Sequence, residues 1–324
     1  MISVVIPSFN AGHTLADTVR SALVQDVEKE IIVVDDGSTD ATAAIAASFG
    51  PAVRCVSVPN AGVSAARNLG AEMARGDFVV YLDSDDLLVE GTLSARLAAI
   101  QRTGDDVAYV GWQKLHGMSA DPTPGTEKEL PFPEDREALE ISIATGRVWA
   151  PPAAFLFRRT AVEGLRWAMD LLVVQDVRFL FDVAARGARF VRVPEIGVTY
   201  RILEESLSRA SAPRFVADCV RFTDQIEAVW TQRGALTPGQ TEALEEMWSI
   251  VTTASLVQGL PEFRTAFQGY RKYGRTNLKF ELGRALRSVV GAHATARCIG
   301  VYMGAKDRAR ALRQGGVQPR AGKA

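Results

Sequence analysis

The chain has 324 residues, of which 47% are hydrophobic and 23% are charged. This balance is typical of a globular protein and excludes a chain that is disordered throughout. The three cysteines, Cys55, Cys219 and Cys298, lie far apart in the sequence. Their spacing excludes a disulfide-dense scaffold and a cysteine-rich zinc site, and it suits a reducing compartment. The length indicates about two domains.

Charge is distributed unevenly, although the net charge is only −1. The segment from Arg271 to the end contains 13 Lys and Arg but 2 Asp and Glu, so residues 1–270 contain 24 basic and 36 acidic side chains. A basic end of this kind is either a solvated tail or a segment attracted to an anionic surface. We favour peripheral contact with the cytoplasmic leaflet of a membrane and expect no nucleic-acid partner.

The N-terminal sequence MISVVIPSFN has neither a basic leader nor a long apolar run. No uncharged apolar stretch reaches the roughly 20 residues that a membrane-spanning helix needs. We therefore expect a cytoplasmic protein, in peripheral contact with the inner face of the cell membrane.

Apolar runs alternate with helical patterns over the first 110 residues. The runs predict strands at 2–6, 31–34, 53–58 and 78–82. Such alternation is typical of crossover units and predicts a mostly parallel, Rossmann-like sheet flanked by helices.

Weaker signals continue the pattern to about residue 210. They predict a loop at 115–137, strands at 149–158, 189–193 and 197–201, and a helix that begins near Asp176. After about residue 211 the pattern is helical only, to about residue 313. We therefore divide the chain into an α/β domain, 1–210, and a helical C-terminal region, 211–324.

Polar clusters follow three of the expected strands: SFN, DDGSTD and DSDD. Ligands of parallel sheets bind beyond the carboxyl ends of the strands, where these clusters fall. In a turn, Asp83 and Asp85 can converge and offer oxygen ligands to Mg²⁺ or Mn²⁺. A polar turn or a helix cap is the alternative. No GxGxxG motif follows the first strand, which disfavours a dinucleotide site.

Two more side chains are candidates for ligand contact. Asp36 can accept hydrogen bonds from a base or ribose, whereas the alternative for its segment is a helix cap formed by Ser38 or Thr39. Arg67 lies off the apolar face of its helix, so it is free to pair with a phosphate. A surface salt bridge is the alternative for Arg67.

Four segments, SVVIPSFN, VVDDGSTD, NAGVSAARNLG and GDFVVYLDSDD, resemble in this order the motifs of the family 2 glycosyltransferases, which have the GT-A nucleotide-sugar-binding fold. The resemblance is strong over residues 1–110 and looser to about residue 210. It implies a metal-dependent, inverting enzyme that transfers a sugar from a nucleotide-sugar donor, a UDP-sugar, to a hydroxyl of a saccharide or lipid-linked acceptor. The implied product is a cell-surface polysaccharide or glycolipid.

The resemblance also implies roles for single residues. Asp176 matches the catalytic base, Asp83 and Asp85 match ligands of Mn²⁺ or Mg²⁺, and Asp36 matches a contact to uracil. The implied nucleotide-sugar site consists of Pro7, Ser8, Asn10, Asp36, Asn60, Gly62, Arg67 and Asp83.

The chain departs from the family pattern in four places. Phe9 replaces Tyr, Gln175 replaces Glu, the acids of an upstream patch are absent at Trp167-Ala168-Met169, and no His follows Tyr200-Arg201. From its position alone, Asp176 would be interpreted as a helix N-cap. We expect Trp112, Trp149 and Trp167 to pack in the core rather than on sugar rings.

Two other functions remain as alternatives. A non-catalytic nucleotide-sugar-binding protein on the same fold is compatible with the changes at Gln175 and after Arg201. A receiver-type phosphoacceptor domain is less favoured, because its acidic pair should follow the first strand, where this chain has PSFN.

Overall fold

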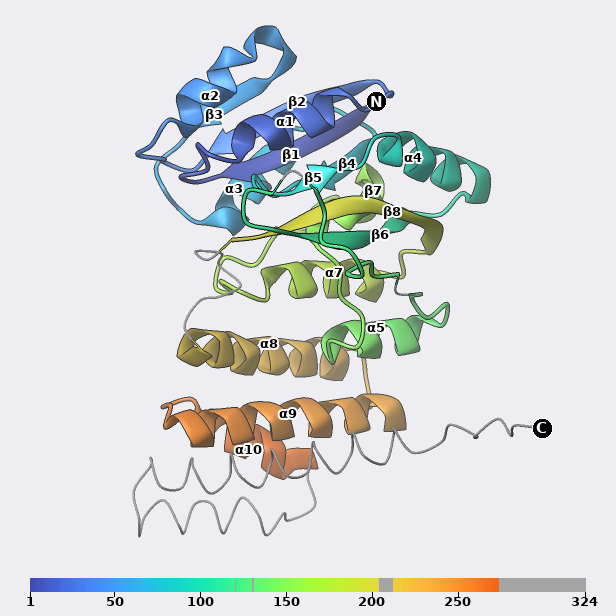
Figure 1. The fold of residues 1–324 in the computed structure, drawn as a ribbon. Coiled ribbons are helices and arrows are strands. Elements are labelled where there is room, and N and C mark those ends of the chain that lie inside the picture. The colour runs from blue at the N-terminus through green and yellow to red at the C-terminus, as the bar shows by residue number, and fades with distance from the viewer. Residues whose placement is uncertain (120, 130, 204–211, 274–324) are drawn as a thin grey trace, which may run out of the picture. The chain divides into compact units, whose positions relative to one another are not determined.

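The structure is a computed structural model that describes residues 1–119, 121–129, 131–203 and 212–273 (Figure 1). The chain divides into two compact units, Met1–Ala210 and Ser211–Ala324. Most of the basic segment that we expect to contact a membrane falls in residues 274–324 and lies outside the described residues, as does the end of the predicted helical pattern.

The N-terminal unit contains one eight-stranded sheet with the order β3-β2-β1-β4-β7-β6-β8-β5. Its strands are β1 (Ile2–Ser8), β2 (Lys29–Asp35), β3 (Arg54–Ser57), β4 (Phe78–Tyr81), β5 (Leu87–Leu88), β6 (Val107–His116), β7 (Phe155–Arg158) and β8 (Phe190–Ile202). The four strands predicted within the first 110 residues are confirmed as β1 to β4. Strand β1 is parallel to both β2 and β4, and β2 is parallel to β3. Their carboxyl ends therefore meet at one edge.

Helices connect and cover these strands. They are α1 (Leu15–Leu23), α2 (Thr42–Ser48), α3 (Val63–Met73), α4 (Thr92–Thr103), α5 (Arg136–Ala144), α6 (Arg159–Val162) and α7 (Gln175–Ala185), with 3₁₀ turns η1 (Gly50–Ala52) and η2 (Pro152–Ala154). Every residue of β1 and the last five residues of β2 are buried, because helices cover both faces of this part of the sheet.

The contact between α3 and the sheet is unusually close at Gly70. A Cβ atom on Gly70 would lie 2.3 Å from Cγ1 of Val5 and 3.4 Å from Cγ2 of Val34. The glycine thus lets the helix backbone approach β1, against which α3 packs. This contact fixes the position of the helix that carries Arg67.

The second half of the sheet differs from the sequence-based expectation. The two strands expected at 189–193 and 197–201 are one strand, β8, which is parallel to β6 (Figure 1). The residues between the two expected strands, Pro194 among them, are accommodated by a shift in register between the pairs Tyr109–Arg192 and Gly111–Ile196.

Two other elements correct the sequence-based expectation. Strand β6 and helix α4 were not anticipated, and β6 occupies the start of the expected loop. The strand expected at 149–158 begins only at Phe155, because η2 precedes it. Strand β7 pairs antiparallel with β4 and β6, and β5 pairs antiparallel with β8, so the sheet is mixed beyond β4.

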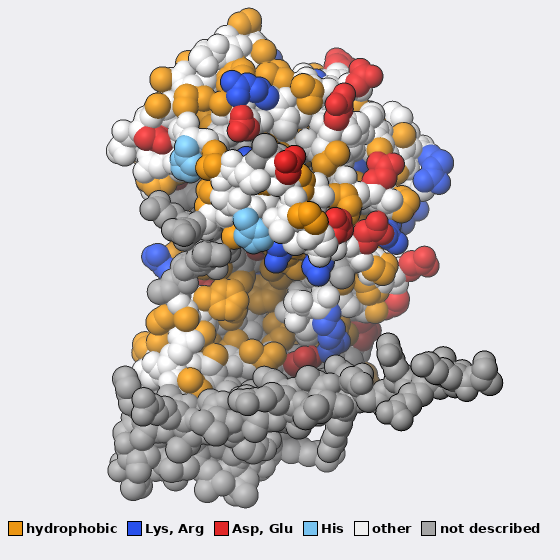
Figure 2. Space-filling model, viewed as in Figure 1, with side chains coloured by type: hydrophobic (Ala, Val, Ile, Leu, Met, Phe, Trp, Pro, Cys, Tyr) orange, Lys and Arg blue, Asp and Glu red, His pale blue; other side chains and the backbone are white. Residues whose placement is uncertain are grey.

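The face of the N-terminal unit seen in Figure 2 has acidic, basic and hydrophobic side chains interspersed. This mixture is typical of a solvated surface. Among the described residues, no helix combines the length and the hydropathy that a membrane-spanning segment requires.

The C-terminal unit is described through three helices, α8 (Ala212–Gln232), α9 (Pro238–Gln258) and α10 (Phe263–Tyr273). Glu227 on α8 connects them, since its carboxylate accepts a hydrogen bond from Nε1 of Trp248 at 2.7 Å and from Nζ of Lys272 at 2.8 Å. Hydrogen bonds to a buried carboxylate are stronger than neutral ones, so Glu227 stabilises the packing of this unit.

We expect Gly70→Ala to lower the melting temperature of the full chain. The added methyl would overlap Val5, and overpacking of this kind costs about 1–3 kcal/mol, more than the gain of up to about 1 kcal/mol from replacing a helical glycine. Ala71→Ser, which adds one heavy atom at a half-buried position on α3, is the control. Equal melting temperatures for both variants in a calorimetric scan would contradict this account of the contact.

Candidate functional site

The loop after β1 is joined to the loop after β2. Asn10 has a φ of 48°, a left-handed conformation that asparagine tolerates better than most residues. In this conformation its Oδ1 accepts a hydrogen bond from the backbone N of Thr39 at 2.9 Å, and its own N donates to Oγ of Ser38 at 2.9 Å. The carbonyl oxygen of Ser8 also accepts a hydrogen bond from the N of Asp36 at 2.8 Å.

Three more of the predicted nucleotide-site residues lie together next to this loop. The buried carboxylate of Asp36 accepts hydrogen bonds from the backbone N of Ala61 and of Gly62, both at 2.8 Å. The side-chain amide of Asn60 donates to the carbonyl oxygen of Asp36 at 2.9 Å. Asp36 thus holds the turn that leads into α3, and its contact with a base stays a prediction. The alternative cap is not formed, because α2 has no side-chain cap at its N-terminus.

The helical pattern predicts that Arg67 is free on the helix surface. The structure shows instead that its side chain is buried and paired. Its side chain is 3% exposed, its Nη2 donates to Oδ1 of Asp83 at 2.5 Å, and its guanidinium lies 4.3 Å from the centre of the Trp167 ring. A planar, weakly hydrated guanidinium can be buried when it is both paired and stacked. The helical pattern could not show this, because both partners are distant in sequence.

Two of the predicted nucleotide-site residues, Ser8 and Arg67, have buried polar atoms without partners in the described part of the chain. Nε and Nη1 of Arg67 and Oγ of Ser8 have no hydrogen-bond partner among the residues that the structure describes. Pro7, the neighbour of Ser8, is the last but one residue of β1. Since buried polar groups are normally satisfied, these atoms are places where a ligand could supply the missing contacts.

Asn68 was not singled out from the sequence, yet it fixes Trp167. Its Nδ2 donates to the carbonyl oxygen of Trp167 at 3.1 Å, and its Oδ1 accepts from the N of Trp167 at 2.8 Å. The Trp167 ring in turn stacks on Phe179 of α7 at 4.3 Å between ring centres. The segment before α7 is therefore attached to α3 on one side and to α7 on the other.

The acidic turn after β4 brings Asp83, Asp85 and Asp86 together. Burial, followed by repulsion from the Asp83 carboxylate, raises the pKa of Asp85 to about 6. Asp86 is fully buried and accepts a hydrogen bond from the backbone N of Arg201 at 3.0 Å.

Arg201, noted in the sequence only as part of a segment without the family's His, anchors this turn from β8. Its Nε donates to the carbonyl oxygen of Asp85 at 2.9 Å, and its Nη1 donates to that of Gly117 at 3.0 Å. The guanidinium thereby ties the acidic turn to the end of β6. No local pattern indicates this contact, which joins residues more than 100 positions apart.

Asp83 and Asp85 suit a hard divalent cation. Their oxygens are the ligand type that Mg²⁺ and Mn²⁺ prefer, and a doubly positive ion would relieve the repulsion that raises the pKa of Asp85. Within the described residues, no group of three or more His, Cys, Asp or Glu side chains is placed to hold a metal. The donor set therefore fits a cation that is also held by phosphate oxygens and water.

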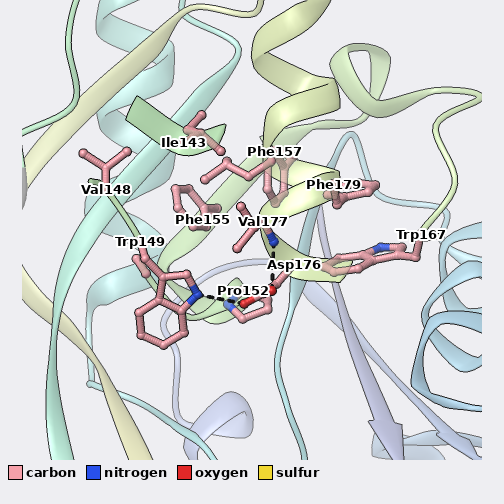
Figure 3. Close-up of a pocket in the computed structure, with 12 residues that line it drawn as sticks. Ile143, Val148, Trp149, Pro152, Phe155, Phe157, Trp167, Asp176, Val177 and Phe179 are labelled. Carbon is pink, nitrogen blue, oxygen red and sulfur yellow. Dashed lines mark hydrogen bonds between the residues drawn. The ribbon is translucent and has the colours of Figure 1, made fainter. Parts of the chain in front are cut away.

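Asp176 lies in the first turn of α7, and its carboxylate points at Trp149 (Figure 3). Its Oδ2 accepts a hydrogen bond from Nε1 of Trp149 at 2.8 Å, and its Oδ1 accepts from the N of Val177 at 2.8 Å. The N-cap alternative is wrong, because Val174 occupies the N-cap position. The surrounding pocket is lined mainly by apolar side chains, among them Ile143, Val148, Trp149, Pro152, Phe155, Phe157, Trp167 and Phe179.

Burial in this apolar pocket raises the pKa of Asp176, against the lowering effect of the hydrogen bonds from Trp149 and Val177. The charge of Arg67 lowers the same pKa, and that of Asp83 raises it. Both groups are therefore within electrostatic reach of Asp176. A carboxylate in such surroundings can take a proton from a neutral hydroxyl.

The model of the family described as "Glycosyl transferase family 2" matches residues 3–165, half of the chain. The succinoglycan biosynthesis protein ExoO of Rhizobium meliloti is 30% identical over 217 residues, which are 64% of this chain and 62% of that protein. This chain thus matches less than two thirds of that relative's length.

Two solved structures are similar in fold. S. aureus TarS 1–349 in complex with UDP-GlcNAc has a TM-score of 0.58 at 18% identity, over 88% of this chain and 91% of that one. The mannosyltransferase PcManGT from Pyrobaculum calidifontis, in complex with GDP-Man and Mn²⁺, has a TM-score of 0.53 at 17% identity, over 93% and 86%. These likenesses confirm the predicted GT-A fold with C-terminal helices.

We expect Asn68→Asp to lower the free energy of unfolding by about 1–3 kcal/mol, the usual cost of a buried polar group left without its partner. The aspartate would lose the donor to the carbonyl oxygen of Trp167 and place an acceptor against it. Gln101→Glu, at an exposed position of α4, is the control for the added charge. Urea denaturation followed by circular dichroism measures both, and equal midpoints would contradict the role of Asn68.

Proposed function

Because the chain belongs to glycosyl transferase family 2, we propose that it transfers a sugar from a nucleotide-sugar donor to the hydroxyl of an acceptor. The observation that carries this proposal is the convergence of Arg67 on α3, Asp83 in the turn after β4 and Asp176 on α7, which lie within electrostatic reach of one another. The similarity to a succinoglycan biosynthesis protein supports a saccharide or lipid-linked acceptor and a role in cell-surface polysaccharide or glycolipid synthesis.

We propose that the nucleotide of the donor binds at the edge formed by the ends of β1 and β2 and the start of α3. Pro7, Ser8 and Asn10 would form one wall, and Asp36, Asn60 and Gly62 the other. UDP is the nucleotide that we favour, because TarS binds UDP-GlcNAc on a similar fold, although PcManGT binds GDP-Man. The unpartnered nitrogens of Arg67 suit the diphosphate.

Asp83 and Asp85 are the proposed ligands of Mn²⁺ or Mg²⁺. Their fit to a divalent cation and the Mn²⁺ of PcManGT support this assignment. A divalent ion bound there would neutralise negative charge on the leaving diphosphate. Arg201 holds the backbone of Asp85, so that the carboxylate is presented from a fixed turn.

In the proposed reaction, Asp176 acts as the general base. The acceptor hydroxyl gives its proton to the Asp176 carboxylate while its oxygen forms a bond to the anomeric carbon of the donor. The bond between that carbon and the diphosphate oxygen breaks, and the electron pair leaves with the diphosphate. A single displacement from the opposite face inverts the configuration of the anomeric carbon. The apolar lining of the pocket around Asp176 would disfavour bound water, which would compete with the acceptor.

Two variants should separate binding from chemistry. We expect Asp85→Ala to remove the Mn²⁺-dependent part of UDP binding, measured by calorimetry. We expect Asp176→Asn to keep that binding while transfer from UDP-sugars falls at least about 100-fold, since a general base contributes about 10²–10⁴-fold.

Asp17→Asn is the control, because Asp17 is exposed on α1 and pairs only with Arg20 among the interactions described. Unchanged transfer by Asp176→Asn would remove Asp176 from the mechanism. Unchanged Mn²⁺ dependence in Asp85→Ala would remove Asp85 as a ligand. Donor binding by the wild-type protein with neither transfer nor hydrolysis would favour the non-catalytic alternative.

We also propose peripheral contact with an anionic membrane through the basic segment that begins at Arg271, on the strength of its charge and of the family resemblance. The full chain should sediment with vesicles that contain phosphatidylglycerol and should be released as salt is raised, because salt screens attraction between exposed charges. Neutral phosphatidylcholine vesicles are the control. Failure to sediment with anionic vesicles at low salt would contradict the proposal.

A further inference from the structure

Three aromatic rings pack edge-on against one another beside Asp176, and we call Trp112, Trp149 and Tyr200 the aromatic cluster. The ring centres are 5.3 Å apart for Trp112 and Trp149, 5.7 Å for Trp149 and Tyr200, and 5.8 Å for Trp112 and Tyr200. Trp112 belongs to β6 and Tyr200 to β8, so two strands of the sheet hold the indole of Trp149.

Trp149 is the member of the cluster that contacts the proposed base. Its Nε1 donates to Oδ2 of Asp176, while the other carboxylate oxygen accepts from the N of Val177 (Figure 3). Each carboxylate oxygen thus has one fixed donor, and the direction of the remaining lone pairs is set by these two contacts. By contrast, Nε1 of Trp112 is buried without a hydrogen-bond partner in the part of the chain that the structure describes.

We propose that Trp149 is a positioning residue for the general base: held by the aromatic cluster, its indole N–H orients the Asp176 carboxylate toward the acceptor hydroxyl. The inference rests on the proposed function, because it takes Asp176 as the base. It differs from the expectation that Trp149 only packs in the core, and it assigns the indole N–H rather than the ring face to the reaction.

The hydrogen bond between Trp149 and Asp176 also affects how the rate of transfer depends on pH. The charged groups that act on Asp176 are Arg67 on α3 and Asp83 after β4, and burial raises the pKa of Asp176 above its ordinary value. The hydrogen bond from Trp149 favours the ionised form and so opposes this rise. Without it, the pKa would rise further. Since a general base must be ionised to act, the acid limb of the pH–rate profile would then move to higher pH.

The test compares Trp149→Phe with Trp112→Phe in the full chain. Both variants replace an indole of the same cluster by a smaller ring, but only the first removes a hydrogen bond to Asp176. We expect Trp149→Phe to lower kcat about 10- to 100-fold, as for the loss of a hydrogen bond to a charged group, to move the acid limb to higher pH, and to leave KM for the donor unchanged. Trp112→Phe should leave the acid limb in place.

A second comparison shows whether Trp149 acts through Asp176. In an Asp176→Asn background, Trp149→Phe should cause no further loss of transfer, because the group that it orients is already disabled. Melting curves and Mn²⁺-dependent UDP binding identify a variant that fails to fold. If Trp149→Phe fails, Trp149→Tyr, which also lacks the N–H, takes its place.

The possible results distinguish a failure of the positioning role of Trp149 from a failure of Asp176 as the base. If Asp176→Asn is inactive while Trp149→Phe matches Trp112→Phe in kcat and in its acid limb, the positioning role is overturned and the base remains. Losses that add in the double variant also overturn it, because they indicate a role in packing. If Asp176→Asn retains full activity, the assignment of the base fails and the inference fails with it.

Discussion

One buried cation organises the polar centre of this protein. The guanidinium of Arg67 pairs with Asp83 and stacks on Trp167. Its charge also opposes the rise in pKa that burial causes at Asp85 and at Asp176, and Arg201 adds to this effect at Asp85. Three carboxylates that would otherwise repel one another thus lie within reach of the charge of Arg67. The guanidinium in turn depends on them, because an isolated charge at this depth would be costly to bury. Neither the acids nor the arginine is arranged independently of the other.

The first half of the fold could be predicted from the sequence because its signals are local. Continuous apolar runs such as 31–34 identify strands that are buried on both faces, and the helical patterns between them identify crossovers. In the second half, the local pattern predicts two strands at 189–193 and 197–201, but these residues form the single strand β8, in which a shift in register accommodates Pro194. Such a shift depends on the neighbouring strand β6, which the pattern around residue 194 cannot report.

In the candidate site too, some residues are indicated by local sequence signals, whereas the contacts of others depend on distant parts of the chain. Asp36, Asp83 and Asp85 are candidates from the sequence because each lies in a polar cluster that follows a predicted strand, and Asp176 is a candidate because of a motif resemblance. Asn68, Trp149 and Arg201 could not be assigned their contacts, since each acts on a backbone group or a carboxylate between 27 and 116 residues away. A local pattern identifies the groups at the strand ends, but the contacts that orient them form only when the chain has folded.

The reciprocal hydrogen bonds of Asn68 have a mechanical consequence. They join α3 to the segment before α7, and the stacking of Trp167 on Phe179 continues the connection into α7 itself. A displacement of α3 relative to α7 would therefore break these contacts or carry the other helix along. We expect a hinge that admits or releases a bound molecule to lie in segments that do not share these hydrogen bonds.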